Sequence, residues 1–495
     1  MKELLLAIDQ GTTGTTALVM NAEGQTLARH TVEFKQHYPQ PGWVEHDADE
    51  IWASVVKSVG VALEKGSIDA TRLAAIGITN QRETTLLWDR ATGAHLHRAI
   101  VWQDRRTAPL CEKLKAEGRE KLVRETTGLV LDPYFSGTKI AWMLENVPGA
   151  RSRAERGELA FGNIDTFLVY KLSGGQEHLT DVTNASRTLL MSLARLSWDD
   201  EMLAMLGVPR AVLPKIVPSA GSIATTKGFP GLPDGLPISG IAGDQQAALF
   251  GQACFGVGDS KCTYGTGAFA LTNVGDAPKP SQRGLIATVA WQVRDRVAYA
   301  LEGSAFIAGA AVQWLRDGLG IISSAAEVET LARSVPSSDG VVFVPALTGL
   351  GAPHWDAHAR GILCGITRGT TKAHIARATL EGIAFQVSDL LTAMGDDLGR
   401  PLNKLRVDGG AAANDLLMQF QADVTGVTIE RPAELESTAR GAAMLAGVGV
   451  GLFADPADAA RMSKVDRTFS PSWDRADRTQ AVERWQAAVA RAKSS

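Results

Sequence analysis

The sequence has few cysteines, no long apolar segment and no excess of charge of either sign. Its 495 residues include four cysteines, none of them in a CxxC pair, so neither a zinc site nor a disulfide framework is expected. The 50 basic and 54 acidic residues nearly cancel, which argues against nucleic acid or an anionic membrane as a partner. The longest weakly polar run, residues 441–454, is shorter than the roughly 20 residues of a membrane span. The first residues turn charged too soon for a signal peptide, and we expect a cytoplasmic protein.

Two common nucleotide-binding motifs are also missing. No GxxxxGK(S/T) occurs, and no GxGxxG opens a helix after an expected strand, so neither a Walker P-loop nor a dinucleotide-binding fold is indicated. The chain exceeds the roughly 250 to 300 residues at which a single hydrophobic core stops growing, so two domains are expected. Short apolar runs alternating with helical patterns predict mixed α/β sheets in each half rather than a barrel.

The central stretch of the sequence is residues 238–267. An expected strand ends at Asp244 and Gln245, the position at which functional side chains of α/β sheets usually lie. The turn Tyr-Gly-Thr-Gly follows at residues 264–267, where two glycines let the backbone approach an anion and Thr266 adds a hydroxyl. The pattern predicts a carboxylate beside a phosphate-binding turn. Two simpler interpretations remain open, in which Asp244 only caps a helix and the glycines only shape a hairpin.

A similar turn lies close to the N-terminus. An expected strand at residues 4–8 runs into Asp9-Gln10-Gly11-Thr12-Thr13-Gly14, and a second strand follows. Gly11 precedes Gly265 by about half the chain. The repetition predicts two halves of the same design that face one cleft and hold a polyphosphate from opposite sides.

Further polar clusters follow other expected strands. Residues 79–85, TNQRETT, contain Arg82 and Glu83, although such a pair can also be a surface ion pair of little energetic weight. Trp102 ends another apolar run, and most tryptophans simply belong to the core. Residues 408–414, DGGAAAN, precede an expected helix, which suits a nucleotide, but their glycines can also serve only a tight strand-to-helix turn.

Apolar periodicity predicts several helices. We expect a helix capped by Asp47, with Ile51 on its buried face, and a long core helix over residues 372–391. Residues 129–162 read as mostly helical. Residues 203–235 are rich in proline and read as a loop-rich excursion over the surface.

Five motifs resemble those of the glycerol kinase family: DQGTT at 9–13, NQRETT at 80–85, GIAGDQQAALFGQ at 240–252, YGTG at 264–267 and DGGAAAN at 408–414. The resemblance covers nearly the whole chain. It implies the actin-like ATPase fold of carbohydrate kinases, with two ribonuclease-H-like domains around a central cleft. Residues 1–250 would hold the glycerol site and the first phosphate hairpin, and residues 251–495 the second phosphate turn and the adenine pocket.

The same resemblance implies ATP-dependent, in-line phosphorylation of glycerol to sn-glycerol 3-phosphate, with ATP and Mg²⁺ as cofactors. Asp244 would be the general base, and Mg²⁺ would lie near Asp9 and Asp244, held through water. The residues implied to hydrogen-bond or pack against glycerol are Arg82, Glu83, Trp102, Tyr134, Asp244, Gln245 and Phe269. Those implied to contact the nucleotide are Thr12, Thr13, Gly14, Thr16, Thr266, Gly309, Gln313, Gly410 and Asn414. We also expect a homo-oligomer.

The first turn departs from the family pattern DQGTTSSR, because Thr16 stands where an arginine is expected to contact the nucleotide phosphates. The departure bears on nucleotide affinity and not on the class of reaction. One alternative is a kinase of the same family that acts on a pentulose or gluconate. A chaperone or filament ATPase of the same fold is a second alternative, but it would have no use for a cluster of Arg82, Glu83, Trp102 and Tyr134.

Family members that respond to a sugar bisphosphate resemble one another in a glycine loop that carries an arginine. The corresponding residues 227–236 have no arginine, and Asp234 stands near the place where one would be needed. Pro230 and Pro233 each remove a backbone N–H from this loop. We therefore expect that fructose 1,6-bisphosphate does not inhibit this protein.

Overall fold

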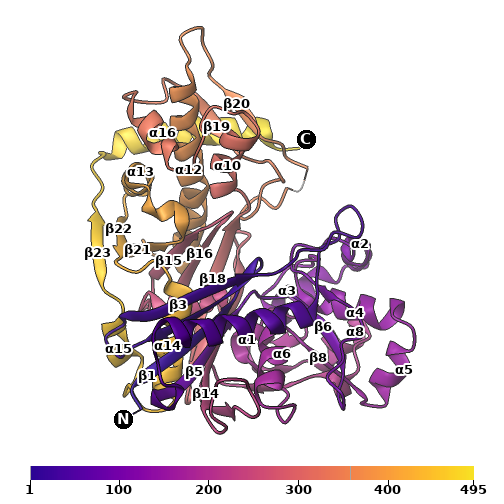
Figure 1. Cartoon of the computed structure of the whole chain (residues 1–495). Coiled ribbons are helices and arrows are strands. Elements are labelled where there is room, and N and C mark those ends of the chain that lie inside the picture. Colours follow the sequence, from indigo (N-terminus) through magenta and orange to yellow (C-terminus); the bar gives the residue numbers. More distant parts are fainter. Residues whose placement is uncertain (1, 357, 495) are drawn as a thin grey trace.

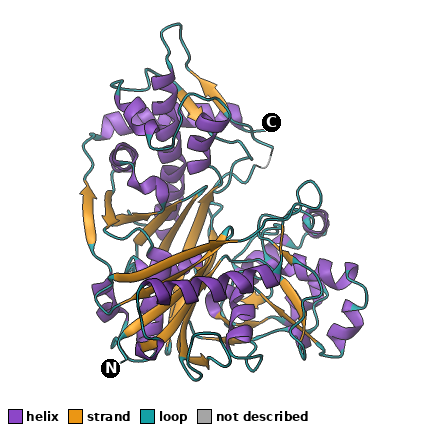
Figure 2. Ribbon diagram, viewed as in Figure 1, coloured by secondary structure: helices purple, strands orange, loops and turns teal. Residues whose placement is uncertain are grey.

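The computed structural model describes residues 2–356 and 358–494, and its centre is one mixed sheet of 13 strands (Figures 1 and 2). In spatial order the strands are β23 (Val465–Phe469), β22 (Thr428–Pro432), β21 (Lys404–Asp408), β15 (Asp259–Tyr264), β16 (Ala268–Gly275), β18 (Arg296–Ala305), β17 (Ile286–Val293), β13 (Ala220–Thr225), β14 (Pro237–Gly243), β5 (Leu73–Asn80), β1 (Leu4–Gln10), β2 (Gly14–Met20) and β3 (Thr26–Glu33).

The two ends of the sheet repeat one pairing scheme. β1 pairs antiparallel with β2 and parallel with β5, and β15 pairs antiparallel with β16 and parallel with β21. Each of the two glycine turns therefore connects the two strands of an antiparallel hairpin. The first strand of each hairpin also pairs in parallel with a third strand. The mixed α/β fold class predicted from the sequence is confirmed.

Sixteen α-helices cover or extend this sheet in the described residues. They are α1 (Ala48–Lys65), α2 (Ala108–Ala116), α3 (Glu120–Thr127), α4 (Ser136–Asn146), α5 (Ala150–Glu155), α6 (Ile164–Leu172), α7 (Val182–Ala185), α8 (Asp200–Leu206), α9 (Asp244–Gly251), α10 (Gly309–Asp317), α11 (Glu327–Arg333), α12 (Lys372–Leu398), α13 (Asp415–Thr425), α14 (Ser437–Gly449), α15 (Pro456–Ala459) and α16 (Arg475–Ala492). Figure 1 shows α10, α12, α13 and α16 gathered at one end of the sheet, and α2, α4, α5 and α8 in a separate group.

Short strand pairs and 3₁₀ turns complete the fold. The pairs are β4 (Glu45–His46) with β7 (Ala99–Ile100), β6 (Leu86–Asp89) with β8 (Leu159–Gly162), β9 (Leu179–Asp181) with β12 (Lys215–Val217), β10 (Met191–Ser192) with β11 (Ser197–Trp198), and β19 (Val342–Val344) with β20 (Ile362–Cys364). The 3₁₀ turns are Ala70–Arg72, Arg210–Val212, Gly410–Ala413 and Ala460–Met462. Among residues 2–356 and 358–494, no helix combines the length and the apolar character that a membrane crossing needs.

The helices with the clearest periodicity form where the sequence predicts them. The Asp47 side chain accepts hydrogen bonds from the backbone N–H groups of Asp49 and Glu50, which caps α1. Ile51 on this helix is fully buried. The core helix expected at residues 372–391 is α12, which continues to Leu398 and ends at Gly399, a residue in the left-handed region with φ of 75°. A glycine at this position stops a helix because it adopts positive φ without strain.

Two expectations were partly wrong. Residues 159–162, expected within a mostly helical region, form strand β8, which pairs with β6; four consecutive apolar residues cannot distinguish a buried strand from a helix turn. Residues 203–235, expected as a surface loop, include the end of α8 and strand β13, and β13 lies inside the central sheet between β17 and β14. The prolines of this region flank these elements and do not interrupt them.

Helix α14 is a buried helix that packs against strands from a distant part of the chain. Its residues from Ala439 to Val448 are all buried. A Cβ atom at Gly77 of β5 would lie 2.1 Å from the Ala442 carbonyl oxygen. The backbone of α14 therefore rests directly on the backbone of β5, and glycine is required at that crossing.

Candidate active site

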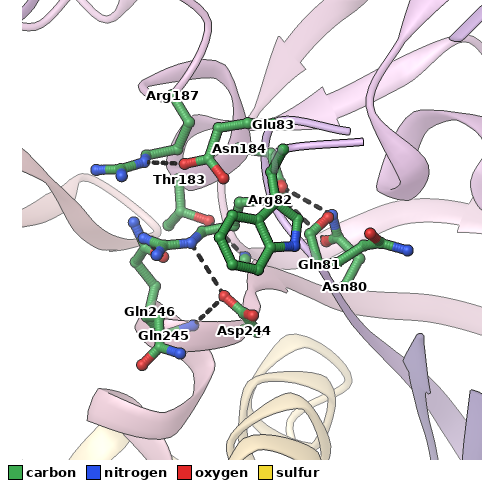
Figure 3. Close-up of polar contacts among 12 residues, drawn as sticks. Asn80, Gln81, Arg82, Glu83, Thr183, Asn184, Arg187, Asp244, Gln245 and Gln246 are labelled. Atoms are coloured by element: carbon green, nitrogen blue, oxygen red, sulfur yellow. Dashed lines mark hydrogen bonds and ion pairs between the residues drawn. The ribbon is translucent and has the colours of Figure 1, made fainter. Parts of the chain in front are cut away.

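Three neighbouring parallel strands bring the polar clusters to one edge of the sheet. β1 and β14 flank β5, with Asp9 opposite Thr79 and Gly243 opposite Asn80. Arg82 and Glu83 follow β5, and Asp244 follows β14. Because the carboxyl ends of parallel strands meet at the same edge, the side chains of Arg82, Glu83 and Asp244 come together (Figure 3).

Asp244 is oriented by two hydrogen-bond donors. The Arg82 Nε atom lies 3.0 Å from Asp244 Oδ1, and the Gln245 backbone N–H donates to the same oxygen at 2.7 Å. Asp244 Oδ2 accepts no hydrogen bond from any residue that the structure describes. The Arg82 side chain is 2% exposed and that of Asp244 33%. Burial raises the pKa of Asp244, while Arg82 and Lys261 oppose the rise. The carboxylate is thus fixed at one oxygen and open at the other.

Glu83 occupies an uncommon backbone conformation. Its φ is 59°, in the left-handed region, which costs a non-glycine residue about 1 to 3 kcal/mol. The Arg187 Nε atom donates to Glu83 Oε1 at 2.6 Å, and both side chains are buried. Burial raises the pKa of Glu83, and the two arginines Arg187 and Arg82 oppose the rise. Such local strain is typical of a functional position. The expected alternative of a surface Arg82–Glu83 ion pair was wrong, since both residues are buried.

Two aromatic residues stand beside these charges. The rings of Trp102 and Tyr134 meet edge to face, with centroids 5.7 Å apart, and Arg82 Nη2 donates to the Tyr134 hydroxyl at 3.3 Å. Trp102 Nε1 donates to Thr12 Oγ1 at 2.9 Å, so this ring also contacts the first glycine turn. Phe269 lies in β16, and no ring contact joins it to Trp102 or Tyr134.

Gln245, the last of the residues expected at glycerol, is held from the second half of the chain. The buried Lys261 of β15 donates from Nζ to Gln245 Oε1 and, at 2.9 Å, to Thr263 Oγ1. This lysine precedes the second glycine turn by three residues. The end of β14 and the second turn are thereby connected through side chains.

A pocket of about 500 Å³ lies against the second turn. Five of the residues expected at the nucleotide line it: Thr266, Gly309, Gln313, Gly410 and Asn414. Gln313 lies on α10, and Asn414 caps α13 by accepting from the Leu417 backbone N–H at 2.9 Å. The pocket therefore lies beside the N-terminal ends of two helices, whose dipoles favour an anion.

Close backbone contacts shape this pocket. The Gly309 backbone N–H donates to the Gly265 carbonyl at 2.9 Å, and a Cβ at Gly309 would lie 2.7 Å from that oxygen. Gly409 has φ of 83°, and a Cβ there would lie 2.6 Å from the Tyr264 carbonyl oxygen. The simpler interpretation of a tight turn thus holds for Gly409, while its neighbour Gly410 lines the pocket.

The remaining nucleotide candidates belong to the first turn and to strand β2 that follows it, and none of them lines this pocket. Gly14 accepts a hydrogen bond from the Gly11 backbone N–H at 2.9 Å, and Thr13 is exposed at the tip. Thr16 hydrogen-bonds Thr31 through the two hydroxyls at 2.9 Å. In the described part of the chain, Asp9 accepts no hydrogen bond on its carboxylate. Burial, together with Glu436 and Asp244, raises the pKa of Asp9 to about 8, so a cation at this carboxylate would be stabilised.

Comparison with known proteins extends these observations. A model of the N-terminal domain of the FGGY family of carbohydrate kinases matches residues 4–251, and one of its C-terminal domain matches residues 260–450. The chain is 57% identical over 490 residues to a glycerol kinase of Myxococcus xanthus, covering 99% of each. It is 56% identical over 492 residues to a glycerol kinase of Deinococcus radiodurans, covering 99% of this chain and 98% of that protein.

Solved structures show the same similarity. A Plasmodium falciparum glycerol kinase with ADP superposes with a TM-score of 0.92 at 36% identity, covering 99% of this chain and 98% of that one. A xylulose kinase of Lactobacillus acidophilus superposes with a TM-score of 0.87 at 23% identity, covering 98% and 97%, and so shares the fold.

Proposed function

The chain belongs to the FGGY family of carbohydrate kinases, and we propose from its site that it transfers the γ-phosphoryl group of ATP to glycerol, forming sn-glycerol 3-phosphate. The observation that carries the choice of glycerol is the similarity, over nearly the whole length, to glycerol kinases. The arrangement around Asp244 supports this choice because it offers a small polyol both polar side chains and aromatic rings to contact.

The polar side chains are arranged for a small triol. Glycerol has almost no apolar surface, so a site must surround it with fixed donors and acceptors. Arg82, Glu83, Tyr134, Asp244 and Gln245 are proposed to supply these groups. The side chains of Trp102 and Phe269 are proposed to pack against the carbon atoms and limit the size of the substrate.

Asp244 is proposed as the general base. Its Oδ1 atom is held by Arg82 and the Gln245 backbone, which leaves Oδ2 to take the proton of the terminal glycerol hydroxyl as that oxygen attacks the γ-phosphorus in line. Phosphoryl transfer requires mainly such positioning together with neutralisation of charge.

The nucleotide is proposed to bind between the two glycine turns. Gly309, Gln313, Gly410 and Asn414 would line the nucleoside end, and Thr266 would contact the phosphates. From the opposite side, the phosphates would be approached by Thr12, Thr13 and Gly14 of the first turn and by Thr16 of β2. The pocket of about 500 Å³ beside Thr266 supports this arrangement because its size suits a nucleoside.

Mg²⁺ is proposed to accompany the ATP phosphates, near Asp9 and Asp244. Both carboxylates have a raised pKa, and each repels the other, so the pair suits a hydrated divalent cation. When bound, this ion would neutralise charge on the transferring phosphate. Two domains, at residues 1–250 and 251–495, are likewise proposed. A homo-oligomer and a cytoplasmic location stay predictions.

A substrate panel tests the proposal. ADP release would be measured with ATP and Mg²⁺ in the presence of glycerol, dihydroxyacetone, xylulose or gluconate, and glycerol should give the highest kcat/KM. A higher value with xylulose or gluconate would favour the alternative kinases. ADP release that no polyol increases would instead favour an ATPase of the chaperone or filament class.

A further inference from the structure

Glu302 is a buried carboxylate for which the proposed reaction gives no role. It lies in β18, within the run Tyr299-Ala300-Leu301-Glu302-Gly303, and its side chain is 1% exposed. A buried ionised carboxylate is costly unless it is paired and hydrogen-bonded. Its partners therefore indicate why a charge stands at this position.

Two arginines from the first half of the chain share this carboxylate. Arg82 Nη1 lies 2.6 Å from Glu302 Oε2, and Arg82 Nη2 lies 3.0 Å from Oε1. Arg187, which follows α7, donates from Nη2 to Oε1 at 3.1 Å. Glu302 thus accepts a bidentate pair from one guanidinium and a single bond from another, and this geometry fixes the planes of both.

The same two arginines hold the side chains proposed to contact glycerol. With Nη1 and Nη2 placed by Glu302, Arg82 directs Nε to Asp244 Oδ1 at 3.0 Å and Nη2 to the Tyr134 hydroxyl at 3.3 Å. Arg187 directs Nε to Glu83 Oε1 at 2.6 Å. Glu302 itself contacts none of Asp244, Tyr134 or Glu83 through any hydrogen bond of the described structure.

We infer that Glu302 is a positioning residue for glycerol phosphorylation, which sets Asp244, Glu83 and Tyr134 through Arg82 and Arg187. This inference rests on the proposed function of the site. Because Glu302 belongs to β18 while Arg82 and Arg187 belong to the first half of the chain, the glycerol site is complete only when both halves are joined through this carboxylate.

The charges around Glu302 indicate how the two arginines would rearrange without it. Glu83, Glu302 and Asp244 carry three negative charges, and the positive charges that face them are those of Arg82, Arg187 and Lys261. Without Glu302 the guanidiniums lose their shared acceptor and turn to the remaining carboxylates. Arg82, which already pairs with Asp244 Oδ1, would then also bind the open oxygen Oδ2, which removes the acceptor that the proton of glycerol requires.

Two substitutions separate this role from simple packing. Glu302→Gln keeps the size of the side chain but loses its charge, and one of its terminal groups becomes a donor facing a guanidinium. Glu302→Asp keeps the charge but is shorter by one methylene. If packing volume matters, the glutamine variant should be the more active one; if the charge that orients the arginines matters, the aspartate variant should be.

Steady-state kinetics and calorimetric binding of glycerol and of ADP would be measured for the wild type and both variants. Glu302→Gln should lower kcat/KM for glycerol by at least about 30-fold, the lower end of what losing one partner of a buried charge pair costs. Both kcat and the affinity for glycerol should fall, while ADP affinity stays unchanged. Glu302→Asp should be intermediate.

Glu430→Gln is the matched control. Glu430 lies in β22 of the same sheet and also bridges two cations, at 3.0 Å from Lys404 and 3.1 Å from Arg406. This variant should have wild-type kinetics. Four results would each overturn the inference. They are wild-type glycerol turnover in Glu302→Gln, a parallel loss of ADP binding, a glutamine variant that is more active than the aspartate variant, and failure of both variants to fold. A wild type that does not phosphorylate glycerol would instead overturn the proposed function.

Discussion

Replacing the proposed base, Asp244→Asn, is the most direct perturbation of the chemistry. The amide keeps the shape of the carboxylate, and its oxygen can still accept from Arg82 Nε and from the Gln245 backbone N–H. The other position becomes an NH₂ group, which cannot take a proton. Arg82 retains its two hydrogen bonds to Glu302, so we expect the site to keep its shape and the protein to remain folded.

The expected loss in kcat is about 10² to 10⁴-fold, the contribution of a positioned general base. This corresponds to about 3 to 5 kcal/mol of activation free energy. Glycerol binding should change much less, because the ground-state contacts of Arg82, Glu83 and Tyr134 persist. The effect should therefore appear in kcat and not in the calorimetric affinity for glycerol.

ADP release at saturating glycerol and ATP measures kcat, and calorimetry measures the affinity. Asp397→Asn serves as the control, since Asp397 also accepts a backbone N–H, from Gln282 at 2.9 Å, but lies at the end of α12. It should have wild-type kcat. Near-normal turnover by Asp244→Asn would refute the assignment of the base, and a loss of glycerol binding with a lowered Tm would show that Asp244 serves the fold.

Three further outcomes are expected. Thr16→Arg should tighten ADP, since a charge-assisted hydrogen bond contributes roughly 1.5 to 3 kcal/mol; an unchanged calorimetric affinity would mean that another group already serves the phosphates. Burial and the neighbouring Asp181 raise the pKa of Asp165 to about 7, so the folded protein retains a proton that the unfolded chain releases. Stability should then fall by at most about 1.4 kcal/mol per pH unit between about pH 4 and pH 7, and Asp165→Asn should flatten this slope in Tm; an identical slope would contradict the assignment. Fructose 1,6-bisphosphate at millimolar concentration should not inhibit, because Asp234 Oδ1 already accepts from the Gly228 backbone N–H at 2.7 Å; saturable inhibition at fixed free Mg²⁺ would contradict this.

The sequence predicted correctly those parts of the fold that depend on interactions between residues close to one another in the chain. The cap at Asp47 and the periodicity of α12 are visible in the sequence because both involve residues within a few positions of one another. Strand β13 was missed because its residues, Ala220–Thr225, are mostly small and partly polar, and its place in the sheet depends on pairing with Ile238 and Val293. Such distant pairing leaves no periodic signal.

In the site, too, the residues within local motifs were predicted and those held by distant partners were not. Asp244 and Arg82 were found because each follows an apolar strand, where functional residues of α/β sheets lie. Arg187 and Glu302 were missed because no motif surrounds them, and their partners are 104 and 220 residues away. The one available signal was a lone acidic residue within the apolar run of β18, since an unpaired charge would not be tolerated there.

The contact between α14 and the central sheet has a consequence for folding during synthesis on the ribosome. Gly77 and Gly240 present bare backbone to this helix, and the Ser239 hydroxyl donates to the Ala446 carbonyl at 3.0 Å. The sheet of the first half is synthesised long before the helix that covers it, with roughly 200 residues between them. At about 5 to 20 residues per second, that face stays uncovered for on the order of ten to forty seconds. The nascent first half therefore presents an apolar surface to chaperones until nearly the whole chain has been made.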